Sequence, residues 1–326
     1  MPIAPPVDAP PFRIVRTSHV ELGVTDLGRA RAFWCDALGL AETASDADAL
    51  HLRGMEERAH HSLVLRRAAA PCCRAIGLRV WSEDDLDRAA HWFGARELPT
   101  GFVARQGQGR TLATVDPAGT PLEFYAASDA AECLLQQYGR HRGARPQRID
   151  HVNCFTPDCD ASFAFYNALG FRLTEYTVAE DGEALWAVWM QRKGGVHDIA
   201  FTNGAGPRLH HLAYWAGSVN AIVDACDILA TTGWLAAMER GPGRHGISNA
   251  FFLYARDPDG HRVELFASDY LTVDADHAPK RWELRDAQRQ TLWGAAAPRS
   301  WFEEGTGFEG VATLPPVRES RPIVAP

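Results

Sequence analysis

Asp150-His151-Val152-Asn153 opens a strand-and-helix segment that occurs twice in the chain. The segment continues to a helical stretch that ends at Gly170, and the same order of residue types runs from Ser18-His19-Val20-Glu21-Leu22 to a stretch that ends at Gly39. Glycine is favoured just beyond the end of a helix because positive φ is needed there. A repeat of this length organises a whole chain, so we expect two similar halves.

Two further pairs of segments extend the repeat. Asp116-Pro117-Ala118-Gly119 matches Asp257-Pro258-Asp259-Gly260, and both fit a type I turn that leads into a strand with a glutamate four residues beyond the glycine. Residues 74–81 match residues 208–215, and each reads as a strand followed by a helix, at 83–93 and 219–231. Each half therefore contains two strand–helix–strands units.

These units predict an α+β protein built from four βαβββ modules in two tandem barrel-like domains. We expect an N-terminal arm at 1–11, a first domain at 12–137, a linker at 138–147 and a second domain at 148–272. Beyond 272 the repeat stops, and we expect the C-terminal tail, 273–326, to cover the active site.

Composition excludes several classes of partner. The 326 residues carry 33 Lys and Arg against 41 Asp and Glu, a formal net charge of -8, which disfavours nucleic acid as a ligand. No apolar run approaches the roughly 20 residues that a membrane span requires. The seven cysteines lack zinc-ribbon spacing and indicate free thiols, so we expect a cytoplasmic protein with no membrane partner.

Alignment of the halves brings three positions into register. They are His151, His211 and Glu264 in the second half, and His19, Gly77 and Glu123 in the first. Two histidines and one carboxylate on separate strands fit a metal site that leaves half of an octahedral sphere open. Gly77 offers no ligand, so we expect the first half to be metal-free.

The individual histidines carry little information by themselves. The chain has thirteen, and a single histidine is more often a paired core or surface residue than a ligand. Recurrence at equivalent points of a repeat is what favours the metal site. Because neighbours on a strand face opposite sides, we expect His211 to be the ligand and His210 to point away. We interpret His60-His61 as structural.

The motifs resemble those of the vicinal oxygen chelate superfamily, and more narrowly the type I extradiol ring-cleaving dioxygenases, especially those acting on homoprotocatechuate (3,4-dihydroxyphenylacetate). The resemblance covers about residues 12–305. It is most specific in four segments: Asp150–Asn153, Arg192–Asp198, Gly206–His211 and Glu239–Gly246. It continues through Ser248–Tyr254 to Asp257–Glu264.

The resemblance implies an enzyme that cleaves a catechol with O2 beside its hydroxyls to give a semialdehyde. It implies that His151, His211 and Glu264 bind Fe(II), or Mn(II) as in a few relatives, and that the chain forms a homotetramer. It further implies that His197 is an acid/base residue, that Tyr254 is catalytic, and that Asn153, Trp189 and His245 line the substrate pocket. By composition alone, Tyr254 and Trp189 read as core aromatics.

The substrate's ring substituents remain open at this point. Arg240 matches a carboxylate-binding arginine of the family, but the second such arginine aligns with Gln290, which follows Arg289. A glutamine supplies no charge, so we weigh an acidic catechol against a neutral one. We expect a para-substituted catechol bound by Arg240 and Arg289.

Two other function classes use the same scaffold. One is a metal-dependent isomerase or lyase of the glyoxalase type, which uses a fourth protein ligand. The other is a ligand-sequestering protein of the bleomycin-resistance kind, which performs no chemistry. The complete His/His/Glu set and the pair His197 and Tyr254 favour the dioxygenase over both.

Overall fold

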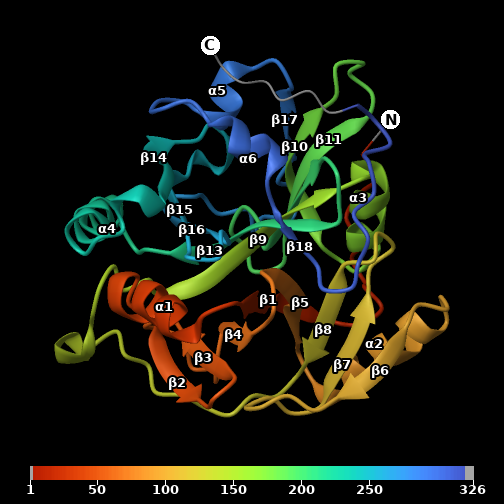
Figure 1. The fold of residues 1–326 in the computed structure, drawn as a ribbon. Helices are drawn as coiled ribbons and strands as arrows, with labels where there is room; N and C mark the ends of the chain where they lie inside the picture. Colours follow the sequence, from red (N-terminus) through yellow and green to blue (C-terminus); the bar gives the residue numbers. More distant parts are fainter. Residues whose placement is uncertain (1–2, 320–326) are drawn as a thin grey trace.

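The computed structural model describes residues 3–319, so Met1 and Pro2 of the predicted arm and residues 320–326 of the predicted tail lie outside the described residues. Two sheets lie one above the other, with the earlier half of the chain below and the later half above (Figure 1). The first has the strand order β2-β3-β4-β1-β5-β8-β7-β6, and the second has β14-β15-β16-β13-β9-β12-β11-β10-β17.

The first half contains these elements: β1 (Ile14–Val24), α1 (Leu27–Arg31), β2 (Ala41–Ser45), β3 (Ala49–Arg53), β4 (Leu63–Arg67), β5 (Cys72–Val80), α2 (Glu83–Gly94), β6 (Thr100–Val103), β7 (Thr111–Val115) and β8 (Pro121–Tyr125). Helix α1 continues as a π-helical turn over Ala32–Ala37. The elements form two βαβββ modules that meet where β1 and β5 pair antiparallel.

The second half repeats this plan with these elements: β9 (Arg148–Thr156), α3 (Cys159–Ala168), β10 (Arg172–Val178), β11 (Leu185–Gln191), β12 (Ile199–Asn203), β13 (Arg208–Trp215), α4 (Val219–Thr231), β14 (Met238–Arg244), β15 (Phe251–Arg256) and β16 (Arg262–Ala267). Its modules meet where β9 and β13 pair antiparallel. The predicted fold class of four βαβββ modules in two tandem units is therefore confirmed.

Local sequence explains where the elements begin and end. The carboxylates of Asp26 and Asp158 accept backbone N–H groups at the starts of α1 and α3. These bonds satisfy donors that the helix itself leaves unpaired. Gly39 and Gly170 follow the helical turns with φ of 83° and 85°, a conformation that favours glycine. None of the helices within residues 3–319 is both long and apolar enough to cross a membrane.

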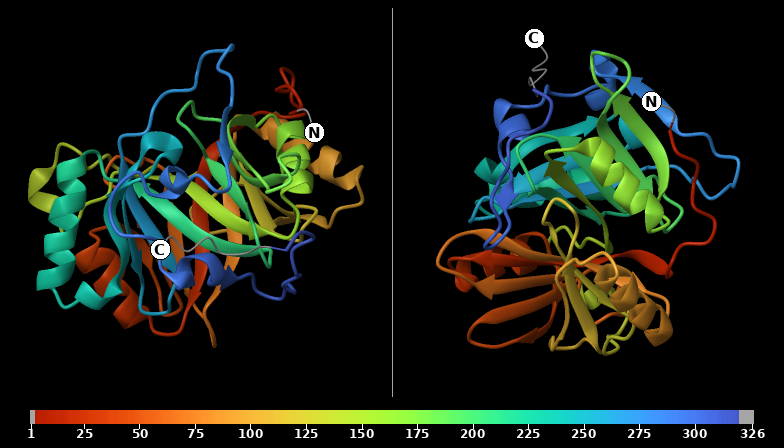
Figure 2. Two further views of the ribbon diagram at one scale, coloured as in Figure 1. Left: turned by 90° about the horizontal axis from the view of Figure 1, so that it is seen from above. Right: turned by 90° about the vertical axis from the view of Figure 1, so that its right-hand side faces the viewer.

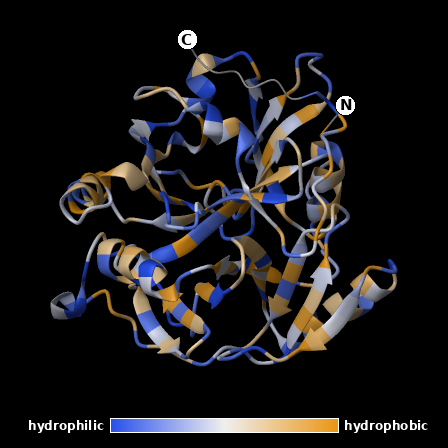
Figure 3. Ribbon diagram, in the orientation of Figure 1, coloured by the Kyte–Doolittle hydropathy of each residue, from blue (hydrophilic) through white to orange (hydrophobic). Residues whose placement is uncertain are grey.

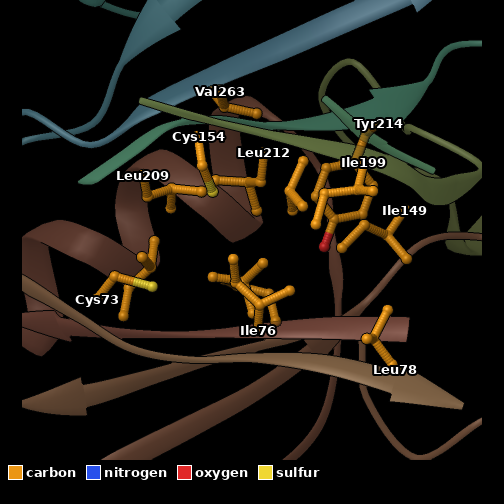
Figure 4. Packing of buried hydrophobic residues seen from close by; sticks show 14 of the residues in the cluster. Cys73, Ile76, Leu78, Ile149, Cys154, Ile199, Leu209, Leu212, Tyr214 and Val263 are labelled. Atoms are coloured by element: carbon orange, nitrogen blue, oxygen red, sulfur yellow. The ribbon is translucent and has the colours of Figure 1, made fainter. Parts of the chain in front are cut away.

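The apolar core runs through both halves and across the boundary between them. Figure 4 shows Ile76 of β5 facing Cys154, Leu209 and Leu212 of the second sheet, and all four side chains are buried. Hydrophilic segments interrupt the apolar strands, notably on β9 (Figure 3), whose sequence includes Asp150, His151 and Asn153. Such buried polar residues need partners, which makes this strand a candidate for function.

The tail adds to the second half beyond the predicted repeat. Strand β17 (Lys280–Glu283) pairs parallel with β10, and β18 (Thr306–Gly307) pairs with β13. Helices α5 (Ala287–Gln290) and α6 (Arg299–Glu303) lie between these two strands in the chain. Two further views show that this segment lies against the second half of the chain (Figure 2).

Candidate metal centre and active-site pocket

Three neighbouring strands of the second sheet each place one side chain at a shared point. His151 lies on β9, His211 on β13 and Glu264 on β16. His151 Nε2 is 3.0 Å from Glu264 Oε2, and His211 Nε2 is 3.3 Å from both that oxygen and His151 Nε2. The three ligand atoms lie within 4.8 Å of one another, and within residues 3–319 no other cluster of His, Cys, Asp and Glu meets this criterion.

The environment favours the metal-binding forms of Glu264 and His211. Burial favours a neutral Glu264, but the adjacent imidazoles of His151 and His211 outweigh burial and hold the pKa of Glu264 well below its usual range. Burial lowers the pKa of His211 to about 4, so this imidazole is neutral near pH 7. A carboxylate and a neutral imidazole are the protonation states that metal ligation requires. The donor set therefore fits a divalent cation.

The expectation that His210 points away from the site is wrong. Strands β9 and β13 pair Leu209 with Cys154 and His211 with Asn153, so His210 is an extra residue in a β-bulge. The bulge breaks the alternation of sides on which the expectation rested. His210 Nδ1 lies 2.6 Å from His211 Nδ1, and both histidines border the same pocket.

All of the predicted site residues border one pocket. These are the three candidate ligands, the predicted catalytic pair and the predicted substrate-binding set: His151, His211, Glu264, His197, Tyr254, Asn153, Trp189, Arg240, His245 and Arg289. The structure thus brings together side chains from six strands, helix α5 and two loops. Their roles in binding and catalysis stay predictions.

Tyr254 and His245 form a hydrogen-bonded pair in the pocket wall. His245 Nδ1 donates to the carbonyl of Gln290, so Nε2 carries a lone pair and accepts from the Tyr254 hydroxyl at 2.9 Å. Burial, followed by the charge of Glu264, raises the pKa of Tyr254 well above its usual range. The hydroxyl therefore keeps its proton and remains a donor.

His197 faces the metal ligands directly. Its ring centroid lies 3.8 Å from that of His151. Burial, followed by the neighbouring His151, lowers the pKa of His197 well below its usual range. The imidazole is therefore neutral in this environment, with one ring nitrogen unprotonated.

Two arginines in the pocket have side-chain nitrogens without a hydrogen-bond partner among residues 3–319. Arg240 is 4% exposed, and its Nη2 donates to the carbonyl of Gln290 and the hydroxyl of Thr291. In the part of the chain that the structure describes, Arg240 Nε and Nη1 and Arg289 Nε are buried without a hydrogen-bond partner. Burial lowers the pKa of each arginine to about 10, which leaves both charged at neutral pH. Arg240 lies over the ring of Trp301 and Arg289 over the ring of Trp186, and these cation–π contacts offset part of the cost of burying the two charges.

Sequence reasoning missed two aromatic residues of the tail. Trp301 and Phe302 of α6 border the pocket, and the Trp301 ring lies 4.3 Å from that of Tyr254. The helix is held by Arg262, which is 2% exposed and donates to the carbonyls of Ser300 and Glu304. The tryptophans spaced along a polar tail were the available signal, because isolated aromatics there need a surface to cover.

Comparison with known proteins follows the same division of the chain. Residues 148–265 match the Glyoxalase/Bleomycin resistance protein/Dioxygenase superfamily. The chain is 32% identical to "Manganese-dependent 2,3-dihydroxybiphenyl 1,2-dioxygenase" of Geobacillus genomosp. 3, over 86% of this chain and 93% of the relative. It is 30% identical to "Metapyrocatechase" of Geobacillus stearothermophilus, over 91% of this chain and 95% of the relative.

Solved structures agree. A substrate complex of homoprotocatechuate 2,3-dioxygenase from Brevibacterium fuscum is 38% identical with a TM-score of 0.88, and it covers 94% of this chain and 96% of that one. A variant of the same enzyme reaches a TM-score of 0.92 at 36% identity, covering 97% and 90%. These likenesses favour ring cleavage over the isomerase and sequestering alternatives. The chain belongs to the extradiol catechol dioxygenases of the vicinal oxygen chelate superfamily.

Proposed function

We propose that the protein uses Fe(II), held by His151, His211 and Glu264, to cleave a para-substituted catechol with an acidic side chain. When bound, the ion supplies a shared coordination site for both catechol oxygens and O2, and it makes the catechol hydroxyls easier to deprotonate. Three protein ligands leave the remaining positions open for them. The His/His/Glu set fits Mn(II) as well, so the choice of Fe(II) does not come from the ligand set itself.

His197 and Tyr254 of the pocket wall carry out the acid–base chemistry. His197 accepts a proton from a catechol hydroxyl at a ring nitrogen and returns it as the ring opens, because its neutral imidazole sits beside the ligand set. Tyr254 donates its retained proton to a substrate oxygen when the O–H bond rotates away from His245. Trp189 and Asn153 line the pocket that would hold the catechol ring, and Trp301 and Phe302 of the tail line it as well.

The acidic substituent rests on one observation, the unpaired buried nitrogens of Arg240 and Arg289. Strand pairing sets Arg240 opposite Tyr254, and Tyr254 opposite Glu264. Two strand spacings put Arg240 about 10 Å from the ligand row. That distance suits a carboxylate on a short arm para to one hydroxyl, as in 3,4-dihydroxyphenylacetate. Gln290 accepts a hydrogen bond from Arg240 through its backbone carbonyl, and its side chain carries no charge. The second positive charge beside Arg240 therefore comes from Arg289.

A pair of substrates tests the acidic substituent. We expect Arg240→Ala to raise KM for 3,4-dihydroxyphenylacetate about 10- to 100-fold, which corresponds to one charged hydrogen-bonded pair. KM for 4-methylcatechol, which has no carboxylate, should change much less. An unchanged KM for the acid would contradict the assignment and leave a neutral catechol as the substrate.

The reaction itself is tested by loading the purified protein anaerobically with Fe(II) or Mn(II). Oxygen uptake and absorbance are then followed over a panel of catechols. We expect O2 consumption with a yellow ring-opened product, and higher activity with Fe(II). Absence of both signals with every catechol would contradict the proposal.

The assembly and the domain limits complete the proposal. The family resemblance favours a homotetramer, and light scattering on the purified protein would give four chain masses. We propose domains at 12–137 and 148–272, which limited proteolysis within 138–147 would test. The cytoplasmic location stays a prediction.

A further inference from the structure

Each candidate histidine ligand is hydrogen-bonded by the residue that precedes it in the chain. His151 Nδ1 lies 3.0 Å from the carboxylate Oδ2 of Asp150. His211 Nδ1 lies 2.6 Å from Nδ1 of His210. Both preceding residues are buried, with 3% and 4% of their surface exposed. Because the Nδ1 atoms are engaged, both ligands present Nε2 to the shared point.

The hydrogen-bond chain through His210 fixes its direction. His210 Nε2 lies 2.8 Å from the carbonyl oxygen of Trp301, and a carbonyl only accepts. His210 Nε2 therefore carries the proton, and its Nδ1 is a lone pair. That lone pair accepts the Nδ1 proton of His211, which leaves the Nε2 lone pair of His211 directed at the ion site. The packing of α6 is therefore linked, through His210, to the orientation of the candidate ligand His211.

Asp150 plays the matching part for His151, with a charge. The carboxylate accepts the Nδ1 proton of His151 and leaves Nε2 as a lone pair. Lys193 Nζ lies 3.3 Å from Asp150 Oδ2 and donates to the carbonyl of Asp150 at 2.7 Å. Lys193 also donates to the carbonyl of His197. The Lys193 ammonium group therefore holds the backbone in place at both Asp150 and His197.

The first half offers a natural contrast. His19 occupies the position of His151, and its Nδ1 lies 3.1 Å from the hydroxyl of Ser18. A hydroxyl is neutral and can donate or accept, so it does not impose one tautomer on its partner. The charged partner thus occurs only in the half with the complete ligand set.

We propose that Asp150 and His210 are positioning residues for the metal centre, which set the Nε2-donor tautomer and ring orientation of His151 and His211. This inference rests on the proposed metal site. Partners of this kind raise the basicity of a ligand imidazole, and their loss typically costs 10- to 100-fold in metal affinity.

The test measures metal affinity without substrate. Mn(II) is titrated against a fluorescent chelator in the wild type, Asp150→Asn, Asp150→Ala, His210→Met and His210→Gln. We expect Kd to rise about 10- to 100-fold in Asp150→Asn, more in Asp150→Ala, and about 10-fold in His210→Met. His210→Gln should recover affinity, since its amide can accept from His211 and donate to Trp301.

Two controls separate positioning from folding. Ser18→Ala removes the equivalent partner in the first half and should leave Kd unchanged. Thermal unfolding of the metal-free Asp150→Asn protein should match the wild type, and the EPR spectrum of its bound Mn(II) should change. Unchanged Kd and spectrum in both Asp150→Asn and His210→Met would overturn the inference alone. A wild type that binds no Mn(II) would overturn the metal site as well.

Discussion

The two halves of the molecule have equivalent strands, but the side chains at the position of the candidate metal site differ between them. In the second half, two imidazoles and a carboxylate converge. In the first half, Gly77 replaces the second histidine, and the ring of His19 fills the space, since a Cβ on Gly77 would lie 2.0 Å from it. Glu123 is bonded to Arg105 Nε at 2.7 Å, and its other oxygen lies 3.4 Å from His19 Nε2.

This difference shows how one duplicated framework supports an ion site or an internal salt bridge. The Arg105 guanidinium supplies, from the protein itself, the positive charge that a metal supplies in the second half. A buried carboxylate needs one or the other, because an unpaired buried charge is strongly destabilising. The loss of a single ligand, at Gly77, is therefore accompanied by a cation that satisfies Glu123.

The comparison extends to a second histidine pair. His61 lies two residues before Leu63 of β4, as His197 lies two residues before Ile199 of β12. Leu63 and Ile199 pair with equivalent residues of β1 and β9. His61 Nε2 is bonded to Gln108, and burial, followed by the neighbouring His19, lowers the pKa of His61 to about 2. His61 is therefore a buried, hydrogen-bonded residue of the first half.

The largest effect is expected when the second half is made to resemble the first. His211→Gly removes one ligand and should abolish ring cleavage, a loss of at least about 10⁴-fold in kcat/KM, since enzymes accelerate reactions about 10⁶-fold or more. Oxygen uptake with the best catechol measures it. Activity within 10-fold of the wild type would contradict the ligand assignment.

A matched pair of histidine variants should separate the halves next. His197→Gln removes the proton carrier and should lower kcat about 10²- to 10⁴-fold. His61→Gln should leave kcat unchanged and lower the free energy of unfolding by about 1 kcal/mol, the worth of one hydrogen bond. Steady-state kinetics and urea unfolding of both variants check this. Similar kcat losses in both would show that the halves do not divide the work.

The reverse substitution should fail to restore a site. Gly77→His forces a side chain into the space of the His19 ring, so we expect the free energy of unfolding to fall by about 1–3 kcal/mol. Metal content should stay at that of the wild type. A second ion per chain with unchanged stability would refute the view that His19 blocks the position.

Arg105→Gln should give the smallest effect. Burial alone would raise the pKa of Glu123, but hydrogen bonds from His19 and Arg105 outweigh it and hold that pKa below its usual value. This stability is present above the ordinary glutamate pKa of about 4.3 and is lost as pH falls through the lowered folded value. Because the Arg105 side chain is 36% exposed and solvent screens its charge, the expected loss at pH 7 is about 0.2–1 kcal/mol.

Urea unfolding from pH 3 to pH 7 checks this prediction. The difference between Arg105→Gln and the wild type should shrink as Glu123 becomes protonated. A difference that stays constant with pH would mean that Arg105 acts through packing alone.

The sequence predicted the modules and the three converging positions because both recur in the two halves. Turn glycines, helix caps and a repeated strand pattern are local features, and the register of the halves singled out His151, His211 and Glu264. Recurrence could not reveal the bulge at His210, which depends on pairing between β9 and β13. It also could not identify Trp301 and Phe302 as pocket residues, because they lie in the tail, which is outside the repeat.

Metal content per chain, measured after anaerobic loading with Fe(II) and removal of excess metal, tests the central claim most directly. The account predicts one ion in the wild type and none in Glu264→Ala. Retention of the ion by Glu264→Ala, two ions per wild-type chain, or none at all would contradict it.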